Sequence, residues 1–148
     1  MVTQTEAQRI LDAVRTYPGD GFELRIFAMR ELDTLDDYNW SGIYVLDGDV
    51  LRLDAYVGAA TDHTEIPVGG GVCGTAVAEN ANQVIEDVRE LENYLACSLQ
   101  TRAEIVVLIR DGDTILGQID IDGHRTGAFD GSDEAFLEEL ATLLAERW

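Results

Sequence analysis

Two cysteines, Cys73 and Cys97, are the side chains of this sequence best suited to nucleophilic or redox chemistry. Cys73 follows a glycine-rich turn, residues 69–72, which predicts the start of a short helix. The dipole of that helix would favour a thiolate in its first turn. Cys97 lies in a predicted loop just before a β-hairpin. A small buried residue without chemistry is the alternative interpretation of Cys73.

Metal binding has little support in the sequence. There is no Cys-x-x-Cys motif, no zinc-ligand spacing and only two histidines, so no structural metal site is expected. The glycine-rich turn also lacks the Lys-Ser/Thr pair of a P-loop, which argues against a phosphate site. The sequence therefore indicates thiol chemistry that uses neither a metal nor a cofactor.

Three carboxylates, Glu104, Asp120 and Asp122, lie at the open end of the hairpin that follows Cys97. A tight turn at residues 111–112 predicts that residues whose numbers sum to about 224 face each other, which places Glu104 opposite Asp120. Asp120 and Asp122 share one strand face because side chains alternate. Carboxylates held together raise one another's pKa, and a protonated carboxyl group beside a thiol can act as a general acid. The alternative is a solvated acidic rim.

Hydrophobic patterns predict the elements that position these residues. An Asp-Gly turn joins the two strands of each predicted hairpin, and a short helix ending near Asn80 lies between the hairpins. Amphipathic helices are expected at both ends of the chain. The predicted helices are residues 5–17, 21–32 and a C-terminal helix behind the cap candidates Asp130 and Ser132; the predicted strands are 40–46, 50–57, 83–86, 104–109 and 114–122. We expect one α+β domain over residues 1–148, a central antiparallel sheet flanked by helices.

The composition is strongly acidic. The chain has 29 Asp and Glu residues against 10 basic residues, all of them Arg, and its formal net charge is −19. This charge argues against nucleic acid and anionic membranes as partners. Together with the absence of Lys it favours a halophilic, salt-rich cytoplasm, since salt screens the repulsion; an ordinary acidic protein is the alternative. A cytoplasmic location is expected, because the sequence shows neither a signal peptide nor a membrane-length apolar run.

Five short motifs, taken in their order and spacing, resemble one enzyme family. They are residues 39–44 (Asn-Trp-Ser-Gly-Ile-Tyr), 71–76 (Gly-Val-Cys-Gly-Thr-Ala), 96–97 (Ala-Cys), 104–107 (Glu-Ile-Val-Val) and 116–122 (Leu-Gly-Gln-Ile-Asp-Ile-Asp). From about Asp37 onward the sequence is similar to the free methionine-(R)-sulfoxide reductases, a branch of the GAF-domain superfamily. The resemblance implies a GAF-like fold, free methionine sulfoxide as the substrate and a homodimer.

The resemblance also implies roles for individual residues. Cys97 and Cys73 would perform the reduction, and Trp40 would pack near the substrate methyl group. The substrate-binding set that it implies is Trp40, Tyr44, Glu104, Asp120 and Asp122. The sequence departs from the family pattern at His63, where members commonly carry a third cysteine. Cys73 is therefore the only second thiol available to Cys97.

The expected reaction is a thiol-dependent reduction. The Cys97 thiolate attacks the sulfoxide sulfur while a carboxyl group, Glu104 in first place, protonates the departing oxygen, and Cys97 becomes a sulfenic acid. Cys73 then closes a disulfide that a thioredoxin-type reductant opens. The two cysteines could also have exchanged roles. The alternatives are a non-catalytic GAF module that senses a small molecule and a thiol-redox sensor without sulfoxide specificity.

Overall fold

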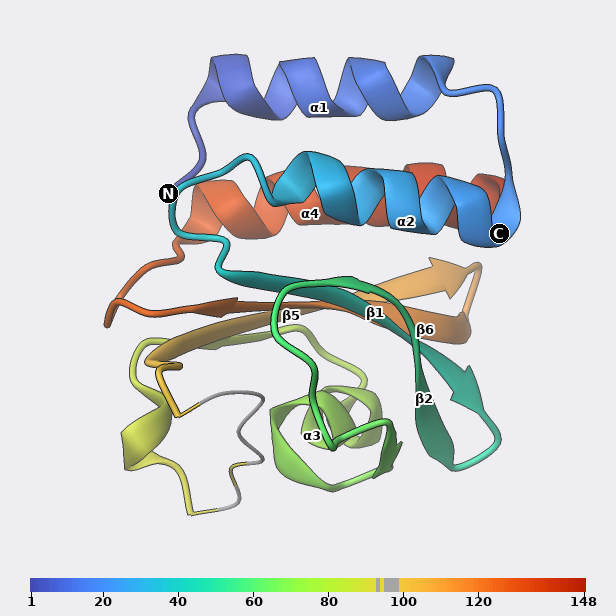
Figure 1. Ribbon diagram of the computed structural model, residues 1–148. Coiled ribbons are helices and arrows are strands. Elements are labelled where there is room, and N and C mark those ends of the chain that lie inside the picture. Colours follow the sequence, from blue (N-terminus) through green and yellow to red (C-terminus); the bar gives the residue numbers. More distant parts are fainter. Residues whose placement is uncertain (93, 95–98) are drawn as a thin grey trace.

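The protein is built on a six-stranded sheet in which each pair of neighbouring strands is antiparallel (Figure 1). The computed structural model describes residues 1–92, 94 and 99–148. The strand order is β3-β2-β1-β6-β5-β4. The strands are β1 (Trp40–Asp47), β2 (Val50–Val57), β3 (Glu65–Pro67), β4 (Gln83–Ile85), β5 (Ala103–Asp111) and β6 (Thr114–Gly123). The predicted hairpins are β1-β2 and β5-β6, and both are confirmed.

The turn of the β5-β6 hairpin lies later than the sequence predicted. Asp111 pairs with Thr114, so Gly112 and Asp113 form the turn, and Gly112 adopts a positive φ of +60°. A register shift next to Ile109 then places one extra residue in β6. Both effects shift the partner of each β5 residue toward higher residue numbers in β6.

The prediction that Glu104 faces Asp120 is therefore wrong. Glu104 pairs with Asp122, and Asp120 lies opposite Val106. The difference amounts to two residues, which preserves the side-chain face because alternation along a strand has a period of two. The three carboxylates thus still lie on one face of the sheet.

Three helices cover the opposite face of the sheet: α1 (Gln4–Thr16), α2 (Gly21–Leu32) and α4 (Gly131–Glu146). Figure 1 shows α2 and α4 next to the sheet and α1 outside them. Capping boxes at Thr3 and Asp130 begin α1 and α4, in agreement with the predicted cap at Asp130. This side holds the larger apolar core. No helix in the described parts of the chain combines the length and apolarity that a membrane crossing requires.

The short helix α3 (Gly71–Glu79) covers the face that carries the carboxylates (Figure 1). It ends at Asn80, which adopts a left-handed conformation with φ of +52°, as the sequence predicted for the end of this helix. The smaller core beneath it consists of Trp40, Tyr44, Leu51, Ile66, Val72, Cys73, Ala76, Val106 and Leu108. Strand β3 and the 3₁₀ turn at Val88–Glu90 were not predicted. The α+β class with an antiparallel sheet between helices is confirmed.

We expect the folded state to depend on salt. With a net charge of −19, repulsion between exposed carboxylates opposes folding when the Debye length is about 10 Å, near 0.1 M salt. At 1 M salt the Debye length falls to about 3 Å and the repulsion is screened. Circular dichroism should show a melting temperature several degrees lower in the dilute potassium chloride. An unchanged melting temperature would contradict adaptation to high salt.

Candidate active site

The glycine-rich turn brings Cys73 onto the sheet. Gly71 begins α3 with φ of +59°, and Cys73 is the third residue of the helix. Gly74 lets the helix approach the preceding loop, because a Cβ at this position would overlap the backbone oxygen of Pro67. Cys73 is buried, and its Sγ lies 3.8 Å from Oε1 of Glu104. The predicted position of Cys73 in the first helical turn is confirmed.

The three carboxylates are buried rather than solvated. The exposed fractions are 2% for Glu104, 0% for Asp120 and 1% for Asp122. One ligand atom each from Cys73, Glu104 and Asp120 lie within 4.8 Å of one another. Among the described residues outside this cluster, no hydrogen-bond donor reaches Oε2 of Glu104 or either carboxylate oxygen of Asp120. The alternative of a solvated acidic rim is therefore wrong.

Burial and mutual repulsion change the acidity of this cluster. Burial raises the pKa of Glu104 well above its usual range, and the negative charges of Asp120 and Asp122 raise it further. The neighbouring Cys73 thiol opposes this increase. Burial also raises the pKa of Asp120, whereas the proximity of Glu104 and Cys73 acts against it. The cluster therefore favours a proton on a carboxyl group beside a thiol.

Trp40 and Tyr44 lie on the same face of the sheet as the carboxylates. Trp40 pairs with Asp122 across β1 and β6, and its Nε1 donates a hydrogen bond of 2.9 Å to the carbonyl oxygen of Ala59. The hydroxyl group of Tyr44 donates to the carbonyl oxygen of His63 at 2.8 Å. His63, which departs from the third cysteine common in the family that the sequence resembles, thus holds Tyr44 through its backbone. Both predicted aromatic residues lie in the core beneath α3.

The site contains one aromatic residue, Tyr56, that the sequence did not reveal. Tyr56 stacks on Trp40 with ring centroids 5.8 Å apart. A register shift makes Tyr56 pair with Gly42 while Leu53 pairs with Tyr44. This irregularity rotates Tyr56 onto the face of Trp40, which a strict alternation along β2 does not predict.

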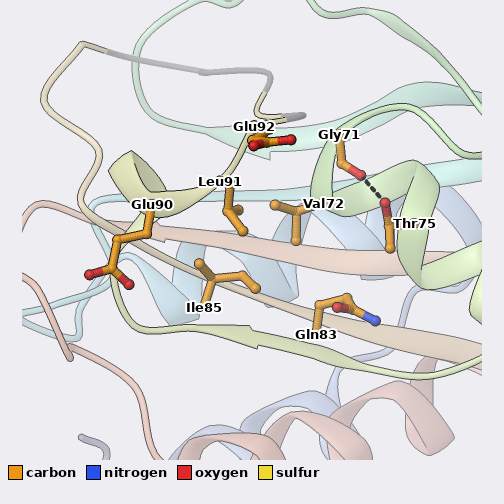
Figure 2. A pocket seen from close by; sticks show the side chains of 8 residues that line it. All are labelled: Gly71, Val72, Thr75, Gln83, Ile85, Glu90, Leu91 and Glu92. Carbon is orange, nitrogen blue, oxygen red and sulfur yellow. Dashed lines mark hydrogen bonds between the residues drawn. The ribbon is translucent and has the colours of Figure 1, made fainter.

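Two cavities lie at the start of α3. The inner one, about 10 Å³, is lined by Ile66, Gly70, Gly71, Val72, Cys73, Glu104 and Asp120. The outer one, about 320 Å³, lies among α3, β4 and residues 90–92. Figure 2 shows Val72, Ile85 and Leu91 around its centre, with Glu90 pointing away. Val72 and Gly71 line both cavities, so the outer pocket adjoins the inner cavity that the thiol and the carboxylates line.

Of the predicted site residues, the structure brings together Cys73, Trp40, Tyr44, Glu104, Asp120 and Asp122. The position predicted for Cys97 lies outside the described residues. Of the four described residues between it and β5, Leu99 and Gln100 are exposed, whereas Thr101 is buried. The assignment of Cys97 as the nucleophile remains a prediction.

A substitution at Gly42 can test how tightly the Trp40 ring is packed. A methyl group on Gly42 would overlap the six-membered ring of Trp40, and a methyl group on Gly58 would lie 2.5 Å from Cδ1 on the other part of the indole. We expect Gly42→Ala to lower the free energy of unfolding by about 1–3 kcal/mol, the usual cost of overpacking, as measured by urea denaturation. Gly131→Ala, which meets no atom within 4 Å, is the matched control. Equal stability of the two variants would mean that the Trp40 ring is free to move.

The chain matches the GAF domain model over residues 6–146. It is 41% identical to free methionine-R-sulfoxide reductase of Escherichia coli (strain K12) over 112 residues, 76% of this chain and 67% of that protein. Its fold is similar to that of a type II free methionine-R-sulfoxide reductase from Thermoplasma acidophilum, with a TM-score of 0.81, 37% identity and coverage of 93% of both chains. The free methionine-R-sulfoxide reductase of Neisseria meningitidis, solved in complex with its substrate, gives a TM-score of 0.88, 29% identity and coverage of 99% of this chain and 92% of that chain. The buried thiol and carboxylates thus lie in a chain that belongs to the GAF-domain family and, within it, to the free methionine-R-sulfoxide reductases.

Proposed function

We propose that this protein reduces free methionine-(R)-sulfoxide to methionine. The observation that carries the proposal is the buried cluster in which the Cys73 thiol, Glu104 and Asp120 meet within 4.8 Å. A sulfoxide oxygen leaves readily only when it is protonated, and this cluster keeps a carboxyl proton available beside a thiol. A GAF module that only binds a ligand needs neither the thiol nor the raised pKa of Glu104.

The burial of the site supports a free amino acid as the substrate. A methionine sulfoxide within a polypeptide would bring its flanking chain into a space enclosed by α3 and the sheet. A free amino acid also carries an ammonium group, which can pair with the carboxylates that remain ionised. Protein-bound methionine sulfoxide has no such charge next to its side chain. The site therefore favours the free form on both steric and electrostatic grounds.

The proposed reaction has two half-reactions. The Cys97 thiolate attacks the sulfur of the sulfoxide, Glu104 transfers its proton to the oxygen, and the oxygen passes to Cys97 as a sulfenic acid while methionine leaves. The Cys73 thiol then attacks the Cys97 sulfur, which releases water and forms the Cys73–Cys97 disulfide. A dithiol of the thioredoxin type reduces that disulfide and is itself oxidised. The sulfur of the substrate is reduced by two electrons, and these come from the two cysteines.

Trp40 and Tyr56 complete the proposed pocket. Their stacked rings lie on the face that carries the carboxylates, next to the pairing of Trp40 with Asp122. Aromatic faces and edges are favourable surroundings for the sulfur and methyl group of methionine. We place the apolar end of the substrate against Trp40, with Tyr44 holding the adjacent loop through His63. A homodimer is part of the same proposal and is tested by sedimentation.

The test is a turnover assay with the separated sulfoxide epimers at high salt and with a dithiol reductant. We expect methionine to form from the free R epimer, with little from the S epimer and little from an N-acetylated methionine sulfoxide in which the ammonium charge is absent. Equal rates for both epimers would contradict a shaped sulfoxide pocket. Binding without turnover would instead identify a sensor module, and thiol oxidation without methionine formation would identify a redox sensor.

A further inference from the structure

The Cys73, Glu104 and Asp120 cluster also has the geometry of a metal site. Its three ligand atoms lie within 4.8 Å of one another, and the Cys73 Sγ to Glu104 Oε1 distance is 3.8 Å. With Zn–S bonds of about 2.3 Å and Zn–O bonds of about 2.0–2.2 Å, a tetrahedral site separates sulfur and oxygen ligands by roughly 3.5–3.7 Å. Small side-chain adjustments would therefore bring all three atoms into bonding distance of one ion.

Asp120 provides an independent indication of a cation. It is completely buried, it lines the inner cavity, and neither of its carboxylate oxygens accepts a hydrogen bond from a described residue outside the cluster of Cys73, Glu104 and Asp120. Oε2 of Glu104 is in the same situation. Buried carboxylate oxygens without a donor are costly, and a cation that they coordinate removes this cost.

We propose that Cys73, Glu104 and Asp120 bind one divalent cation of borderline softness, with Zn²⁺ as the best match. A thiolate ligand disfavours Mg²⁺ and Ca²⁺, which prefer oxygen ligands in greater number. Three protein ligands leave the fourth position to solvent, which is the arrangement of an exchangeable rather than a closed structural zinc site. The ligands come from α3, β5 and β6, so no local sequence motif predicts this site.

The cation and the sulfoxide would exclude each other. This consequence rests on the proposed function, because both occupants need the same carboxylates and the same thiol. Zinc would hold Cys73 as a thiolate complex and replace the proton on Glu104, so it removes both the resolving thiol and the general acid. Zn²⁺ would thus act as a reversible inhibitor that competes with free methionine sulfoxide.

The binding claim is tested on the reduced protein without any turnover, with Co²⁺ as a spectroscopic substitute for Zn²⁺. Cys97→Ser leaves Cys73 as the only thiol in the chain. We expect Co²⁺ to produce a thiolate-to-cobalt charge-transfer band in this variant, and Zn²⁺ to abolish the band by displacement. Adding Asp120→Asn should weaken the affinity for Co²⁺ by at least about tenfold, since even indirect partners of metal ligands account for 10–100-fold. Asp113→Asn, in the exposed hairpin turn, is the matched control and should have no effect.

Three results would overturn the proposal. The first is the absence of a sulfur-to-cobalt band in folded Cys97→Ser, and the second is a band that remains after Cys73→Ser. The third is an equal affinity for Co²⁺ in the Asp120→Asn and Asp113→Asn variants. Circular dichroism establishes folding, and Cys97→Ala serves as a second background if Cys97→Ser does not fold. Co²⁺ on exposed carboxylates would give no sulfur band, so weak surface binding cannot imitate the result. A band in a protein that fails the turnover assay would reject the reductase and retain the metal site.

Discussion

Glu104→Gln should lower turnover of free methionine-(R)-sulfoxide by at least about tenfold, a small part of the 10²–10⁴ that general-acid catalysis usually contributes. Glutamine preserves the shape of the side chain but has no proton to transfer to the departing oxygen. Oxidation of the cysteines by peroxide should continue in the variant, because peroxide does not need this acid. Single-turnover kinetics measures the chemical step directly, since it excludes the recycling of the disulfide.

Glu139→Gln is the matched control for this substitution. Glu139 lies on the exposed face of α4, and the same chemical change there should leave turnover unchanged. If Glu104→Gln reduces the sulfoxide as fast as Glu139→Gln, the acid is not Glu104. Asp120, whose pKa is also raised by burial, becomes the next candidate.

The pH dependence gives a second measure of the same acid. Because the pKa of Glu104 is raised well above its usual range, its protonated form persists to higher pH than in a free glutamate and is lost as the pH rises through that raised value. The rate of the chemical step should decrease over this range, and Glu104→Gln should lack this decrease.

The free energy of unfolding should also decrease as the pH rises over this range. The contribution of protonated Glu104 is fully present below the pKa of the unfolded chain and is lost as pH rises through the folded pKa. Chemical denaturation at several pH values should therefore show a weaker pH dependence for Glu104→Gln.

Cys97→Ser should abolish methionine formation, whereas Cys73→Ser should retain a single turnover and lose recycling. The proposed nucleophile takes the oxygen from the substrate, so no product forms without it. The resolving thiol acts only after methionine has left. In the parent protein, mass spectrometry after oxidation by the substrate should show the loss of two hydrogens within one chain, which corresponds to the Cys73–Cys97 disulfide. In Cys73→Ser the product should be a sulfenic acid that a dimedone-type reagent traps.

The opposite pattern would exchange the two roles. One turnover in Cys97→Ser and none in Cys73→Ser would make Cys73 the nucleophile, which its contact with Glu104 and its place in the first turn of α3 also allow. Disulfides between chains instead of within one chain would show that Cys73 does not resolve the sulfenic acid. Recycling would then pass directly to an external thiol.

The local elements of this protein were predictable from the sequence because their causes are local. Asp47 and Gly48, like the corresponding pair at Asp111 and Gly112, mark hairpins since glycine there adopts the positive φ that a tight turn needs. Asp130 marks the beginning of α4 through its side-chain hydrogen bonds to the helix backbone. The candidate residue set was also recognisable, because the order and spacing of Cys73, Glu104, Asp120 and Asp122 resemble one family along most of the chain.

Only the tertiary structure decided the features that depend on packing between segments distant in the sequence. The β5-β6 register depends on a bulge next to Ile109, which no hydrophobic pattern encodes, and it exchanged Asp120 for Asp122 as the partner of Glu104. Whether the carboxylates are solvated or buried depends on α3 lying over the sheet, which in turn depends on the close approach of Gly74 to Pro67. Charge and spacing alone are the same for an exposed rim and a buried cluster. The raised pKa of Glu104 and the shared contacts with Cys73 follow from burial, so they follow from the fold and not from the order of the residues.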